Sequence, residues 1–135
     1  MVRFNKNDFR KTEFSKLEID QYKQNAERDL EIAGHADIPQ VKFDFSFKAL
    51  IKLGIIIIAI QGFRAASKRG HHIKIIEKIS EILHDDTIEA VGNAMRTKRN
   101  QDFYGGGILI SEKEADEYFD FVKDCFSKAG LSCDF

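Results

Sequence analysis

Apolar residues recur every three to four positions along most of the chain, a spacing that is typical of amphipathic helices. This spacing predicts a first helix over residues 17–34, which ends at a glycine. A second helix is predicted to begin at Pro39 and to continue to about Ser67. Residues 41–47 alternate between apolar and polar, which alone would suit a strand. The apolar run that follows them is too long for a strand, so we expect a helix throughout.

The second helix is apolar on almost every side over residues 55–60, so we expect it to lie at the centre of the fold. Gly54 and Gly62 are expected where a neighbouring element packs closely against it. The remaining apolar stripes and the capping residues Asp85 or Asp86 and Ser111 predict three more helices. These three helices are expected over residues 71–84, 87–103 and 111–129.

The predicted fold class is all-α, an antiparallel up-and-down bundle of four to five helices in a single domain over residues 1–135. Residues 1–14 are polar with isolated phenylalanines, and we expect an N-terminal arm that packs through these rings. The longest apolar stretch, residues 49–60, contains Lys52 and is far short of the roughly 18 residues that cross a membrane. Two cysteines without partners at zinc spacing, and no signal peptide, favour a reduced, cytoplasmic setting.

The charges nearly balance, with 21 basic and 22 acidic residues, which excludes a globally basic nucleic-acid-binding protein. Their distribution is uneven. Residues 61–74 carry four cations and two histidines without an acid, and residues 93–101 carry three more cations without an acid. If these two segments meet in space, they form a local site for an anion.

Arg99 interrupts an apolar stripe. It follows Ile88, Val91 and Met95 at helical spacing, where another leucine would be expected, so its guanidinium should point inward. An inward arginine normally has a carboxylate partner or lines a wet cleft. Asp102 could be that partner within the same helix, and this structural explanation stays open beside a functional one.

No other kind of chemistry has a convincing set of residues. The adjacent His71 and His72 point about 100° apart on a helix, so no metal site and no cofactor are predicted. No serine or cysteine stands beside a base, which argues against a catalytic nucleophile. The three glycines at 105–107 lack the Lys-Ser/Thr of a phosphate-binding loop.

Four short motifs, in order along residues 22–105, resemble the HEPN family of small helical-bundle proteins. They are Ala26-Glu27-Arg28-Asp29-Leu30, Gly62-Phe63-Arg64, Gly70-His71-His72, and Lys98-Arg99-Asn100 followed by Tyr104. The resemblance implies an antiparallel bundle that pairs as a homodimer. It also implies a metal-independent ribonuclease site in the dimer cleft, built from an Arg, the polar residue after it and a nearby His.

Carried over to this chain, the resemblance assigns the catalytic positions to Arg99, Asn100 and Tyr104. The motif histidine does not carry over, because Tyr104 stands in its place and no histidine follows His84. A phenol with an ordinary pKa near 10 is a poor base compared with an imidazole. The ribonuclease motif is therefore altered, although these residues can still bind a phosphate, a ribose or a base.

These observations predict an RNA- or nucleotide-binding protein of the HEPN type, in which Arg96, Lys98, Arg64 and His72 add contacts to the ligand. A solvated helix face explains Arg96 and Lys98 about as well, and packing at a helix N-terminus is a simpler role for His72. One alternative is an active endoribonuclease, a toxin or defence component, in which Tyr104 or His72 replaces the missing relay. Another alternative is a non-catalytic partner of a nucleotidyltransferase.

Overall fold

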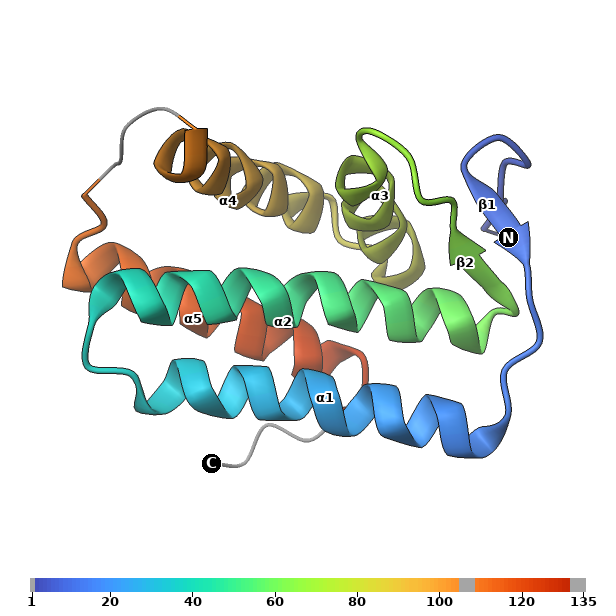
Figure 1. Ribbon diagram of the computed structural model, residues 1–135, viewed down its shortest axis with the longest axis horizontal. Coiled ribbons are helices and arrows are strands. Elements are labelled where there is room, and N and C mark those ends of the chain that lie inside the picture. Colours follow the sequence, from blue (N-terminus) through green and yellow to red (C-terminus); the bar gives the residue numbers. More distant parts are fainter. Residues whose placement is uncertain (1, 105–108, 132–135) are drawn as a thin grey trace.

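The computed structural model describes the backbone of residues 2–104 and 109–131, and the side chains of residues 2–101 and 109–131. Over these residues the chain is mostly helical, with five helices and one small antiparallel sheet (Figure 1). The helical class predicted from the sequence is confirmed. The elements are β1 (Phe9–Lys11), α1 (Lys16–His35), α2 (Pro39–Ile60), β2 (Phe63–Ala65), α3 (His71–Leu83), α4 (Asp86–Tyr104) and α5 (Glu112–Lys128).

Helix α2 lies at the centre of the fold, as its apolar surface predicts. It runs antiparallel to α1, and it also packs against α5, α3, α4 and β2 (Figure 1). Its side chains are buried on several sides, and Phe43, Leu50 and Ile56 are completely inaccessible to solvent. A helix that is apolar all round can be stable in water only when neighbours cover each of its faces. None of the helices in the described part of the chain could cross a membrane.

Two glycines let α3 approach its neighbours closely. A Cβ atom on Gly54 of α2 would collide with Ile75 Cγ2 and lie 3.0 Å from Ile79 Cδ1. On α4, a Cβ atom on Gly92 would lie 2.8 Å from Ile76 Cγ2. The predicted close approach at Gly54 is therefore confirmed. Helix α3 packs against α2 and α4 so closely that neither glycine position has space for a side chain.

The predicted end of the second helix is wrong. Helix α2 stops at Ile60 rather than near Ser67, and the segment that follows forms β2, which pairs with β1. Gly62 causes the break, because its φ of +88° belongs to the left-handed region that favours glycine. Gly62 is thus a turn residue and not a point of close packing.

The N-terminal arm packs through its rings, as predicted, and adds a strand that the sequence pattern does not reveal. The ring of Phe4 stacks on that of Phe63, with 4.2 Å between centroids and 8° between planes. Phe9 of β1 is only 4% exposed, and its partner in the sheet is Ala65. Burial of these rings compensates for the small number of hydrogen bonds in so short a sheet.

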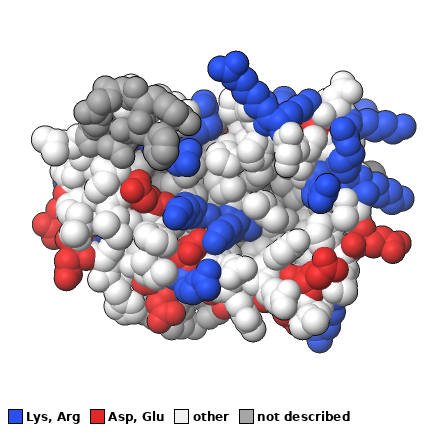
Figure 2. Space-filling model, viewed as in Figure 1, with Lys and Arg blue, Asp and Glu red and all other residues white. Residues whose placement is uncertain are grey.

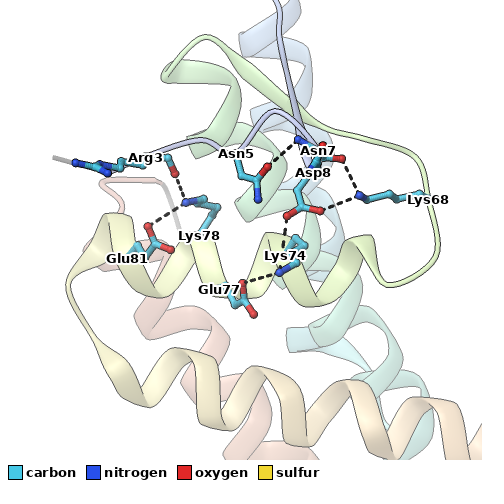
Figure 3. A network of polar contacts seen from close by, with 9 residues as sticks. All are labelled: Arg3, Asn5, Asn7, Asp8, Lys68, Lys74, Glu77, Lys78 and Glu81. Atoms are coloured by element: carbon cyan, nitrogen blue, oxygen red, sulfur yellow. Dashed lines mark hydrogen bonds and ion pairs between the residues drawn. The ribbon is translucent and has the colours of Figure 1, made fainter.

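Polar contacts tie the arm to α3 and to the loop that precedes it (Figure 3). Asp8 forms an ion pair with Lys68 at 2.9 Å and a longer one with Lys74 at 3.8 Å. These two cations hold the pKa of Asp8 below its usual value. Lys78 is only 7% exposed; it donates to the backbone oxygen of Arg3 and to Glu81. The N-terminal arm is therefore held against the β2–α3 loop at Lys68 and against α3 at Lys74 and Lys78.

The predicted helix starts at Asp85 and Ser111 are confirmed. Asp85 Oδ1 accepts from the backbone N–H of Thr87 at 3.0 Å, and so caps the N-terminal end of α4. Ser111 and Glu114 form a reciprocal capping box at the start of α5. These side chains fix where α4 and α5 begin. The residues that follow therefore lie on the helix faces that their spacing in the sequence predicts.

Candidate anion-binding site

A pocket of about 500 Å³ lies between the N-terminal end of α3 and the middle of α4. Two separate stretches of sequence line it, the β2–α3 loop with the first turn of α3, and one face of α4. The two basic segments of the sequence therefore meet in space, which is the condition under which they were expected to form a local anion site. The lining residues are Lys68, Arg69, Gly70, His71, His72, Ile73, Arg96 and Asn100.

The surroundings of this pocket carry positive charge. Figure 2 shows lysine and arginine side chains gathered in the part of the view where Figure 1 places β1, β2 and α3. Helix α3 has no acidic residue in its first turn and no side-chain cap, whereas α1 and α5 begin with capping boxes and acidic residues. The positive end of the α3 dipole thus adds to the field of Lys68, Arg69 and Arg96.

Arg99 is not among the residues that line the pocket, and its guanidinium lies over the ring of a core residue. Its guanidinium carbon is 5.7 Å from the centroid of the Phe47 ring, and Phe47 of α2 is 2% exposed. The imidazole of His72 contacts the same ring edge to face at 5.9 Å. The predicted inward direction of Arg99 is therefore correct, and Phe47 is the common platform that places His72 near Arg99.

His72 is neutral at physiological pH. Burial is the largest cause, and together with the charges of His71, Arg99 and Arg96 it lowers the pKa of His72 to about 4. A neutral imidazole can donate one hydrogen bond and accept another. An anion bound beside this ring would favour its protonated form, because it would offset the charges of the two arginines.

Short contacts orient the other polar groups of the pocket. Arg96 Nε donates to Asn93 Oδ1 at 3.2 Å, which restrains its guanidinium along α4. The Nδ1–H of His71 donates to the backbone oxygen of Lys68 at 3.0 Å. The ring of His71 lies 4.4 Å from that of His72, so the two histidines line the pocket together although they diverge on the helix.

Four of the predicted site residues are brought together, and others are not. His72, Arg96 and Asn100 line the pocket, and Arg99 lies close enough to His72 to affect its pKa. The side chains of Tyr104 and of Asp102, the alternative partner of Arg99, lie outside the described residues.

Two predicted binding residues lie elsewhere. Lys98 Nζ pairs with Glu114 Oε2 at 3.0 Å, which raises the pKa of Lys98 and links α4 to the start of α5. Arg64 is exposed on β2, opposite Arg10 in the sheet, and lines a different pocket. Lys98 therefore serves the packing of two helices, and Arg64 is separated from the α4 cations.

Sequence reasoning missed the role of Phe47 and underestimated His71. Phe47 looks like any other core residue in the apolar pattern, so no signal in the sequence could have marked it. Lys68, Arg69 and His71 all belong to the basic segment 61–74, and that charge run was the available signal.

The pocket can hold an anion by charge and by hydrogen bonds. Among the described side chains, no group of three or more His, Cys, Asp or Glu residues is arranged to hold a metal ion. Burial raises the pKa of the Cys125 thiol to about 12, so this cysteine is unsuited to act as a nucleophile.

Comparison of the chain with protein-family models, with curated proteins and with solved structures found no match.

Proposed function

We propose that this protein binds RNA or a nucleotide through the pocket between α3 and α4, as a HEPN-like domain with an altered ribonuclease motif. One observation carries the proposal: His72 of α3 and Arg96 and Asn100 of α4 line one pocket, and Arg99 lies near enough to lower the pKa of His72. These residue types bind phosphate groups by charge-assisted and neutral hydrogen bonds. Arg69 also lines the pocket and adds attraction for a phosphate backbone of any sequence, whereas the lining Lys68 is paired with Asp8.

The electrostatic balance of the pocket favours a phosphate over a carboxylate-rich partner. Several cations and a helix N-terminus converge here, and Asp8 is the acid that pairs with the nearby Lys68. Such an excess of positive charge is relieved by a ligand that carries more than one negative oxygen. A phosphate group offers three oxygens at a spacing that an arginine fork and an amide can share.

The proposal extends to the finer architecture that the HEPN resemblance implies. The helices would form an up-and-down bundle, and two copies would pair so that their pockets face one cleft. The protein would act in the cytoplasm, in a toxin-antitoxin or defence system. Light scattering after gel filtration tests the pairing, since a dimer has twice the mass of the 15.5 kDa chain.

A second candidate function is metal-independent cleavage of RNA, and the position of His72 favours it. The motif histidine is missing after His84, but His72, which the sequence offered as a replacement, lies near enough to Arg99 on the neighbouring helix for that charge to lower its pKa. A neutral imidazole beside a bound phosphate can accept the proton of a ribose 2′-hydroxyl, whose oxygen then bonds to phosphorus as the bond from phosphorus to the 5′-oxygen of the next nucleotide breaks. The protonated imidazole or a water molecule then donates a proton to that 5′-oxygen. Arg96 or Arg99 would then stabilise the charge that develops on the phosphate.

One experiment tests both functions. Purified protein is incubated with a mixed RNA pool in EDTA, and both retention on a filter and cleavage on a gel are measured. The variants are Arg96→Gln and Arg99→Gln, with Arg28→Gln as the control because Arg28 is an exposed arginine on α1.

Retention by the wild type and the control, with loss in the two pocket variants, supports the binding function. Cleavage that disappears in the same variants supports the enzyme. If all four proteins retain RNA equally, or none retains it, and none of them cleaves it, both functions are contradicted. The protein is then a helical protein that acts through a partner, such as a nucleotidyltransferase.

A further inference from the structure

A second pocket of about 200 Å³ adjoins the candidate site. It lies between the start of α1, the end of α2 and the β2–α3 segment. Two aromatic rings, Phe14 and Tyr22, line it in an edge-to-face pair with 5.8 Å between centroids. Ile58 and Ile75 supply further apolar surface, and Arg64 is among its polar lining residues.

His71 belongs to both pockets, so they are neighbours on the surface. The chain itself connects them as well, because Ser67 lines the second pocket and the next residue, Lys68, lines the first. The first pocket is cationic, and the second is lined by rings and isoleucines. A ligand that spans them must therefore have a charged end and an apolar, flat end a short distance apart.

We propose that the two pockets together take one nucleotide unit, with its phosphate between α3 and α4 and its base against Phe14 and Tyr22. This inference rests on the proposed function and gives it a defined ligand. The nucleotide is either a free nucleoside monophosphate or the 5′-terminal unit of a single-stranded RNA.

The size and chemistry of the second pocket fit a base. Its volume is below the roughly 300–1,000 Å³ of sites that enclose a whole small molecule, so it suits one ring system. Aromatic side chains bind bases by stacking, and every base has a face that can stack. Arg64 can add a cation–π contact or a hydrogen bond to the edge of the base. Double-stranded RNA is excluded as a ligand here, because its bases are stacked on each other.

Calorimetry with three probes tests the inference: AMP, ribose 5-phosphate, and a hexa-adenylate with a 5′-phosphate. We expect AMP to bind wild-type protein about 5- to 150-fold more tightly than ribose 5-phosphate, which is the range that one stacked base contributes. Tyr22→Ala should abolish this difference and leave the affinity for ribose 5-phosphate unchanged. Tyr22 also contacts the core, so a second variant is needed that keeps both native rings.

Ser67→Phe is that variant, since Ser67 is exposed and a ring at this position fills the pocket from outside. Its control is Ser127→Phe, at an exposed position on α5. Loss of AMP affinity in Ser67→Phe alone supports the inference. The same loss for the hexa-adenylate assigns the site to an RNA end, and its absence assigns the site to a free nucleotide.

The possible failures are distinct. If wild-type protein binds AMP and ribose 5-phosphate equally, or if Ser67→Phe binds AMP as the wild type does, the base pocket is wrong and the phosphate pocket stands. If the wild type binds none of the three probes, the inference and the nucleotide-binding function are both overturned.

Discussion

His72 is held neutral in the folded protein, and we therefore expect mild acid to weaken the fold. Its pKa is about 4, against 6.5 for an ordinary histidine, because burial and the nearby cations disfavour the charged ring. Between these two values the unfolded chain binds more protons than the folded chain. The contribution of His72 to the free energy of unfolding is fully present above pH 6.5. It declines as the pH falls towards 4 and changes no further below 4.

The size of the effect follows from the two pKa values. At pH 5 the imidazole is almost fully protonated in the unfolded chain and almost fully neutral in the folded one. The resulting loss between pH 7.5 and pH 5 is about 2 kcal/mol. The His72 ring is only partly buried, and solvent screening makes this figure an upper value. Such a loss is a large part of the stability of a small domain.

Urea unfolding at pH 7.5 and pH 5.0 measures the effect. We expect the wild type to lose more stability between the two pH values than His72→Gln does, by up to about 2 kcal/mol. His35→Gln, at the exposed end of α1, is the control and should lose as much as the wild type. The comparison uses the change with pH within each variant, so any difference in stability at pH 7.5 cancels.

The paired carboxylates do not contribute to the change in stability between pH 7.5 and pH 5.0. Lys128 and Thr87 hold the pKa of Asp85 at about 2, and ion pairs also lower the pKa values of Asp8 and Glu114. Such groups contribute stability above their ordinary pKa values near 4, and it is lost only as the pH falls below them. An equal loss in the wild type and His72→Gln between pH 7.5 and 5.0 would refute the argument, because it would mean that His72 is solvated.

Three further predictions follow from the packing and the ion pairs. Gly54→Ala should lower the free energy of unfolding by about 1–3 kcal/mol in urea titrations, because α3 leaves no space for the new methyl group. Lys52→Met should destabilise by about 3–5 kcal/mol, and Asp29→Asn by clearly less. The Asp29 side chain is 5% exposed and would be left charged and unpaired, whereas Lys52 is 37% exposed and can turn to solvent. In filter binding, Arg96→Gln should weaken RNA retention about tenfold and Lys98→Gln should leave it nearly unchanged, because Lys98 is engaged with Glu114.

The sequence predicts the helices well wherever local signals define their ends. The capping box at Ser111 and the cap at Asp85 are local patterns, and both are where the sequence places them. The central position of α2 also follows from residues 55–60 alone, since a helix without a polar face must be covered on all sides.

The sheet could not be predicted in the same way, because it joins residues that lie far apart in the chain. Phe63 looks like a continuation of the apolar run in α2, and only its stacking on Phe4 distinguishes it. The glycine at position 62 was visible, but a glycine in an apolar run is compatible both with a close contact and with a turn. Its φ of +88° decides between them, and φ is a property of the folded chain.

The candidate site was predictable in its charges and not in its geometry. The two basic segments are evident in the sequence, and the structure brings them together around one pocket. Which cations belong to it depends on partners that the sequence does not reveal. By their spacing in the sequence, Lys98 and Arg96 are equally plausible phosphate contacts. In the structure Lys98 forms an ion pair with Glu114 of α5, whereas Arg96 lines the pocket.

The spacing of the site is set by residues without any polar group. Gly54 and Gly92 bring α3 against α2 and α4 at Ile75 and Ile76, less than two helical turns from His72. Phe47 then receives both His72 and Arg99 on its ring. A larger residue at either glycine would push α3 away and separate the imidazole from the arginines. The chemistry of this pocket therefore depends on the packing of three helices, and variants of Gly54 or Gly92 should alter the pKa of His72 without touching it.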